Sequence, residues 1–147
     1  MAINKRQQIC TAIDTALRTI QKSVGYETDL GNHVFEWRST PIEEGELPAL
    51  VWRDTDEPVE ETIGAHMHRM VLEVELLAAG NASPATLRKM IADVVTLIGA
   101  NLTWGGLAED TKPQIETIAV DQESRRLAGA SLKFEILYTT GRFNPYL

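Results

Sequence analysis

The stretch ASLKFEILYTT, residues 130–140, alternates apolar and polar side chains with a period of two. One face of such a strand would carry its apolar residues Ala130, Leu132, Phe134, Ile136 and Tyr138. Alternation held over this length predicts a half-buried β-strand in an open or antiparallel sheet. Residues 68–78 repeat the pattern, with Met70, Leu72, Val74 and Leu76 set against Arg69, Glu73 and Glu75. The sequence therefore predicts a sheet with at least two long strands.

Two segments outside these strands have helical periodicity. Residues 3–24 place Ile9, Ile13, Leu17, Ile20 and Val24 at spacings of three and four, which makes one apolar stripe that ends before Gly25. A second helix is expected to begin at Ser83-Pro84, because a capping side chain followed by proline is typical of a helix start. It would end near residues 100–101, with a buried face of Leu87, Met90, Ile91, Val94, Leu97 and Ile98.

Shorter strands are expected at residues 34–38, 49–53 and 117–121. Residues 40–48 and 54–66 are rich in acids and turn formers, and the second of these segments is the clearest loop in the chain. A polar link is expected at residues 122–126. The order of elements predicts a single α+β domain over residues 1–147, with a mostly antiparallel sheet of about four to five strands packed by two main helices.

The composition restricts the classes of function. The 147 residues carry a net charge of −7, which argues against tight binding to nucleic acid, because phosphates are neutralised by clustered Lys and Arg. No apolar run approaches the ~18 residues of a membrane-spanning helix, and the first residues lack the apolar core of a signal peptide. The single cysteine, Cys10, falls within a helical pattern and is expected to be a small buried residue. We therefore expect a protein made in the cytoplasm without a membrane partner.

The candidate chemical groups are weak. His66 and His68 would share one face of a strand and could both reach a metal ion, but no third ligand with suitable spacing accompanies them. The acids of the two loops lie among glycine and proline, so solvated charge explains them better than catalysis does. No motif for nucleophilic catalysis or phosphate binding is present. The residues predict no enzyme, no cofactor and no metal.

The aromatic residues outside the long strands divide into two groups. Trp37 and Trp52 fall in predicted strands and are expected to pack in the core. Trp104 precedes two glycines in a turn, and Phe143 and Tyr146 lie in the C-terminal tail. A tail with two aromatics either folds back on its own domain or docks on a neighbour, where aromatic anchors carry binding energy.

Four pieces of the chain, in order, resemble phage tail terminator proteins of the lambda-type minor tail protein U group. They are an amphipathic helix leading to VFEWR (residues 34–38), the segment GELPALVWRD (45–54), the strand HRMVLEVELLA (68–78) followed by the helix SPATLRKMIADVVTLI (83–98), and the closing LKFEILYTTGRFNPYL (132–147). Together they span nearly the whole chain, and none of them is a catalytic signature.

The resemblance implies a structural protein of a phage or prophage. Proteins of this family look like small α+β subunits that close into a ring, commonly a hexamer, on the head-proximal end of the finished tail tube. The ring stops tube polymerisation and offers a surface to the head. The implied partners are other copies of the chain, the tube protein and a head completion or connector protein, and the implied location is the virion.

The residues expected at a subunit or tube interface lie in the acidic loops, in a polar link and in the tail. They are Glu43, Glu44, Glu46, Asp54, Asp56, Glu57, Glu60, Glu61, Arg125, Arg126, Phe143 and Tyr146. The two arginines could pair with Glu57, Glu60 or Glu61 across a subunit boundary, or could be ordinary surface charges. Two alternatives remain: another head–tail joining or tail completion protein, or a small metal-binding module or enzyme that uses His66 and His68.

Overall fold

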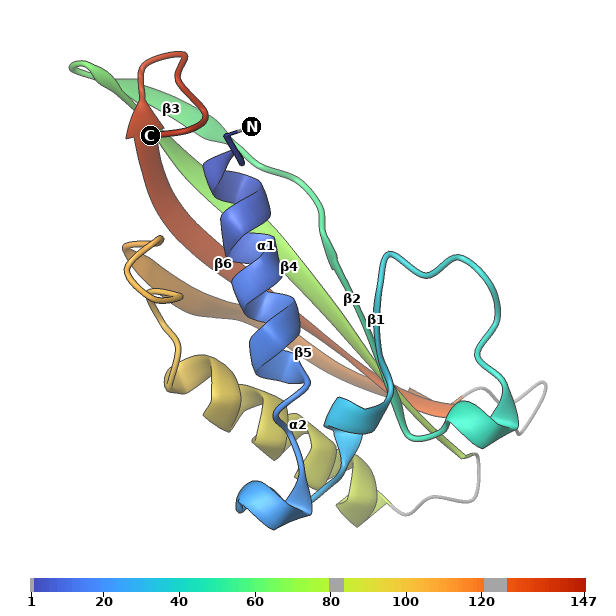
Figure 1. Cartoon of the computed structure of the whole chain (residues 1–147). Helices are drawn as coiled ribbons and strands as arrows, with labels where there is room; N and C mark the ends of the chain where they lie inside the picture. The colour runs from blue at the N-terminus through green and yellow to red at the C-terminus, as the bar shows by residue number, and fades with distance from the viewer. Residues whose placement is uncertain (1, 80–83, 121–126) are drawn as a thin grey trace.

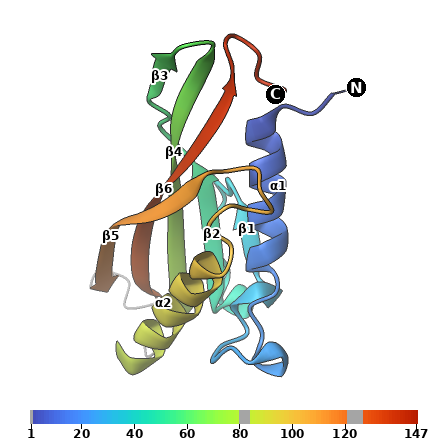
Figure 2. The same ribbon diagram turned by 90° about the vertical axis from the view of Figure 1, so that its left-hand side faces the viewer.

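The computed structural model describes residues 2–79, 84–120 and 127–147. It is an α+β domain in which two helices, α1 (Lys5–Leu17) and α2 (Pro84–Gly99), cover one face of a mixed, mostly antiparallel sheet. Figures 1 and 2 show α1 over the β1–β2 side of the sheet and α2 over the β5–β6 side. Neither helix of the described chain is long and apolar enough to cross a membrane.

The main order of the sheet is β1-β2-β4-β6-β5. The strands are β1 (Val34–Glu36), β2 (Ala49–Asp54), β3 (Val59–Thr62), β4 (Ala65–Ala79), β5 (Asp110–Val120) and β6 (Leu127–Gly141). Only β1 and β2 are parallel, and the antiparallel pair β4–β6 runs the length of the domain from Ala65↔Gly141 to Ala79↔Leu127. The two long strands predicted from alternation are confirmed, and so are the strand at residues 49–53 and the helix that follows residue 83.

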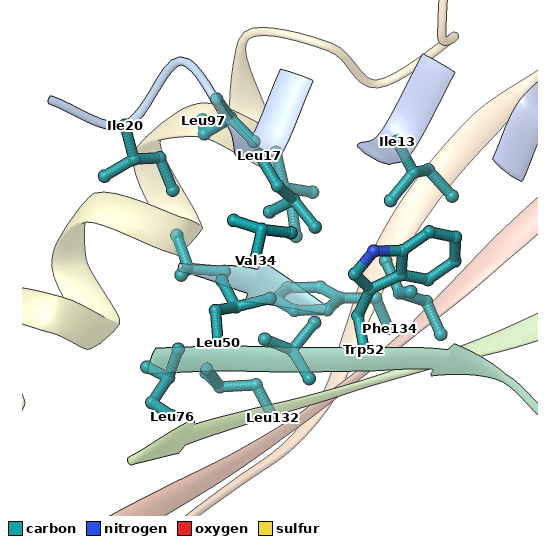
Figure 3. Close-up of a cluster of buried hydrophobic side chains, with 14 of the residues drawn as sticks. Ile13, Leu17, Ile20, Val34, Leu50, Trp52, Leu76, Leu97, Leu132 and Phe134 are labelled. Carbon is teal, nitrogen blue, oxygen red and sulfur yellow. The ribbon is translucent and has the colours of Figure 1, made fainter. Parts of the chain in front are cut away.

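Alternation along β4 and β6 separates a core face from an open face, as predicted. Figure 3 shows side chains from α1, α2, β1, β2, β4 and β6 converging in the layer between helices and sheet. Trp52, 0% exposed, lies in this layer and donates its indole N–H to Asp14 on α1. On the open face, Arg53 pairs with Glu75 at 2.8 Å and Lys133 with Glu73 at 3.3 Å.

The predicted end of the first helix is wrong. The first helix ends at Leu17, not at residue 24, because the chain turns so that Gly31 N–H can donate to Ile20 O at 2.8 Å. A Cβ on Gly31 would lie 2.3 Å from Arg18 O, so only glycine fits this close approach. Ile20 stays buried, but Val24 is 65% exposed and is not part of the stripe.

The other wrong boundaries concern strands. Residues 59–62, predicted as loop, form β3, which pairs with β4 beyond the end of β2 and makes a sixth strand. The strand predicted at 117–121 begins at Asp110, seven residues earlier than expected. The sequence did not indicate a strand at residues 110–116, because β5 is an edge strand whose exposed residues do not alternate with buried ones. The predicted link at 122–126 lies outside the described residues.

Candidate functional site

A cluster of charged and polar side chains lies where the first turn of α1 crosses β4 and β6. Its centre is Glu57, in the segment between β2 and β3. Glu57 accepts the hydroxyl of Tyr138 at 2.5 Å, lies 3.2 Å from His68 Nδ1 and pairs with Arg6 at 3.3 Å. Arg6 also donates to Asp54 Oδ2 at 2.7 Å. We call these five residues the Glu57 cluster.

The backbone explains how Glu57 reaches the core face. Strands β2 and β3 lie along the same side of β4, but regular pairing stops at Asp54 and resumes at Val59. Between them Val71 N–H donates to Asp56 O and Arg69 N–H to Pro58 O, so the segment stays attached to β4 in an irregular conformation. Proline cannot donate to a regular ladder, which favours such a break. The break turns Glu57 inward.

The cluster changes the acid–base properties of its members. Burial, together with the hydrogen bond to Glu57 and the charge of Glu57, raises the pKa of Tyr138 well above its usual range. Burial acts to raise the pKa of Asp54, but hydrogen bonds from Trp37 and Arg6 outweigh it, and the pKa is lowered. The neighbouring Cys10 is buried, and its pKa rises to about 12 through burial and the charge of Asp54. Asp54 is thus ionised and Tyr138 and Cys10 are neutral at pH 7, and each shift favours that state further.

The prediction that the loop acids are solvated is wrong for two of them. The side chain of Glu57 is 13% exposed and that of Asp54 is 16% exposed. Their oxygens are bound to groups from α1, β4, β6 and Trp37, so the cluster ties four segments of the chain together. The cluster therefore stabilises the fold, because each of its carboxylate oxygens already accepts a hydrogen bond or an ion pair from within the chain.

The two histidines share one face of β4, as predicted, but have different partners. Their ring centroids lie 6.3 Å apart. His68 stacks on Tyr138 and binds Glu57 and Thr140, whereas His66 contacts the Phe143 ring at 4.6 Å and lies 3.7 Å from Glu61. Within residues 2–79, 84–120 and 127–147, no group of three or more His, Cys, Asp or Glu side chains is placed to hold a metal ion.

The acids of the other predicted loop lie at the β1 side of the sheet. Glu46 is bound by Arg38 at 2.5 and 2.8 Å, and this pairing lowers its pKa to about 2. Glu43 and Glu44 are exposed, as are Asp56, Glu60 and Glu61 further along the same side. Glu61 pairs with Arg142 of the same chain. Arg125 and Arg126 lie outside the described residues.

The C-terminal tail folds back on its own domain. Lys5 N–H donates to Pro145 O at 2.8 Å, which fixes the tail beside the start of α1. Phe143 nevertheless stays 79% exposed and Tyr146 50% exposed, so both rings remain available to a neighbour. Trp104, which sequence placed only in a turn, is 2% exposed and donates its indole N–H to Thr111 at 2.9 Å.

The expectation that Trp37 packs in the core is wrong. Strand β1 ends at Glu36, and Trp37 is 55% exposed with a φ of 52°. VFEWR reads as a continuous strand, so no local pattern indicates the turn at Trp37. Arg6 was also missed as a site residue, because it is one of 14 Lys and Arg residues in the chain.

Comparison with known proteins adds no assignment to this geometry. A scan against models of protein families finds no match, and neither does a search of the curated proteins.

Proposed function

We propose that this chain is a structural protein of a phage or prophage tail, a terminator that caps the finished tail tube as a ring. The ring stops addition of tube protein and offers a surface on which the head is joined. The subunit performs no catalysis in this role, and its partners are other copies of the chain, the tube protein and a head completion or connector protein. The proposal originates in the order of sequence pieces quoted above.

One structural observation supports an assembly role more than any other. The exposed large apolar side chains lie in at least two places: Ile63 in the β3–β4 turn and Phe143 in the tail share one end of the domain, where Arg142 N–H donates to Gly64 O, and Trp37 lies apart from them beside β1. A subunit in a ring needs separate surfaces for its two neighbours, for the tube and for the head. Exposed apolar residues at two separate places on the domain fit more than one such contact.

The charge also fits passage of DNA through a ring. Six copies at −7 each would give −42, and such a ring would not hold phosphates tightly. The Glu57 cluster would keep the end of the domain that bears the β3–β4 turn and the tail rigid, and rigid surfaces lose less entropy on assembly.

The test is the length of tails in lysates with and without the gene, measured by negative-stain electron microscopy. Overlong, headless tubes in the deletion, restored to normal length by the parent gene in trans, are the expected result. Tails of normal length that lack heads would replace the proposal by a joining role on the portal side. Intact virions in both lysates would refute a role in particle assembly.

A further inference from the structure

Trp37 is an exposed aromatic residue that the chain holds in one position. Its N–H donates to Trp52 O at 2.9 Å, and its indole N–H donates to Asp54 Oδ1 at 2.8 Å. A φ of 52° is an uncommon, strained value for a bulky residue, and strain of this kind persists where the surroundings impose it. The indole donor is thus satisfied inside the chain while 55% of the residue stays in solvent. A fixed, half-exposed tryptophan is well suited to anchor a protein contact.

On the opposite edge of the sheet, strand β5 has a proline and a break in register at a position that lies level with Trp37 across the strands. Trp37 follows the pair Glu36↔Trp52 and is therefore level with Arg53. The register continues from Arg53 through Glu73 and Lys133 to Ile115 on β5. Just before Ile115, β5 has exposed Pro113 and a break in register. A proline and a bulge prevent addition of another strand there, so this edge can receive side chains but not a β-strand.

The charges of the two sides are complementary. The β1–β3 side exposes the acids Glu43, Glu44, Asp56 and Glu60. On the β5 side, Lys112 and the α2 residues Arg88 and Lys89 are exposed, and none of the three makes an ion pair within the part of the chain that the structure describes. Glu116 is the exposed acid of β5 on that side. Figure 2 shows that α2 lies on the β5 side of the domain and α1 on the other. Opposite potentials on two edges orient one copy against the next.

We propose that Trp37 of one copy packs against the β5 edge around Pro113 of a second copy, with the acids of the first facing Lys112, Arg88 and Lys89 of the second. Because the two edges differ, the contact is heterologous and propagates from copy to copy. The inference deepens the proposed function, since a closed ring requires such a contact. A buried tryptophan covers about 150–250 Å² and a stable contact needs roughly 800 Å² per partner, so the flanking charged surface has to take part.

The test places one cysteine beside each edge without altering the anchor. In Ser39→Cys with Gln114→Cys, both positions are exposed, and buried Cys10 will not react. At the highest concentration at which the protein remains in solution, a short thiol cross-linker is expected to give a ladder of dimers, trimers and higher species. Each single-cysteine variant is expected to give no ladder, and an equal mixture of the two is expected to give only dimers.

Adding Trp37→Ala to the double-cysteine chain should reduce cross-linking at least about 10-fold, as for a central aromatic anchor. The matched control is Val24→Ala, which shortens another exposed apolar side chain outside the two edges and should leave the ladder intact. Lys112→Glu should weaken the ladder, and Glu60→Lys in the same chain should restore part of it. Unfolding curves of each variant show whether a loss reflects misfolding.

Absence of the ladder, a ladder insensitive to Trp37→Ala, or dimers from Ser39→Cys alone would each overturn the contact. The last outcome would indicate pairing of identical β1 edges. The readouts are independent of tail length. A cross-linking ladder together with tails of normal length in the deletion would refute termination and leave the contact standing. Overlong tails in the deletion without a cross-linking ladder would support termination and refute the contact.

Discussion

The Glu57 cluster makes a quantitative prediction for Glu57→Ala. The change would leave the hydroxyl of Tyr138, which is 2% exposed, without its acceptor at 2.5 Å. An unsatisfied buried hydroxyl costs about 1–3 kcal/mol. His68 would lose a partly buried hydrogen bond worth about 1 kcal/mol. Arg6 keeps its bonds to Asp54 and to the Thr55 carbonyl, so the loss of its ion pair with Glu57 adds little to the destabilisation. The free energy of unfolding should therefore fall by about 3 kcal/mol.

Urea denaturation at pH 7, followed by circular dichroism, measures this difference. With a denaturant slope of about 2 kcal/mol/M, the transition midpoint should fall by about 1.5 M. Thermal unfolding should show a decrease of roughly 6–12 °C, given about 2–4 °C per kcal/mol in a chain of this size.

The matched control is Glu60→Ala, an exposed acid three residues further on in β3. Its loss should change the free energy of unfolding by less than about 0.5 kcal/mol. Tyr138→Phe should fall between the two, because it removes one hydrogen bond and leaves Glu57 with His68 and Arg6. If Glu57→Ala were no more destabilising than Glu60→Ala, Glu57 would be a solvated loop charge and the cluster would not fasten the fold.

Three further results are expected. Asp93→Ala should lower the free energy of unfolding by about 3 kcal/mol in urea, because this buried carboxylate accepts two backbone N–H groups and the Thr28 hydroxyl; Thr28→Val should cost less. Gly31→Ala should destabilise by more than about 2 kcal/mol, since its Cβ would meet Arg18 O, and wild-type stability would disprove the close approach. The pKa of Asp54 is lowered from 3.8, so the ionised carboxylate stabilises the fold above that pH, and this stabilisation is lost as the pH falls below it. Acid titration should show that the difference in free energy of unfolding between the wild type and Asp54→Asn shrinks as the pH falls below 3.8.

The long-range pairing of the sheet could be predicted because burial imposes a periodic pattern on β4 and β6. One face of each strand lies under the helices, and a one-residue slip would move every apolar residue into solvent. Strand β3 has no such constraint: all four of its residues are exposed. Its sequence VEET therefore reads as loop, and only the partner strand β4, which extends past β2, explains why it pairs.

The Glu57 cluster could not be predicted for a different reason. Its members come from four segments, and the hydrogen-bonded pair Glu57 and Tyr138 is separated by 81 residues. Local pattern can indicate that Tyr138 lies on the apolar face of its strand, but not that a carboxylate from a broken edge reaches it. Trp37 was misplaced because a strand that stops two residues early and turns to a positive φ has no signature in VFEWR. Both errors arise where the backbone leaves regular pairing.

The same departures from regular pairing limit how the domain can associate. A sheet with two free edges tends to add strands and polymerise without limit. Here the β1 edge is only three residues long and is followed by Trp37, while the β5 edge is interrupted by Pro113 and a bulge at the same height. Backbone pairing is thus restricted on both sides, and side chains have to supply any contact between copies. A contact made by one tryptophan and a rim of opposite charges is weak in isolation and sensitive to salt. It would therefore form more efficiently where copies are concentrated or held close together, as on the end of a tube, and a subunit that is monomeric in dilute solution would still assemble there.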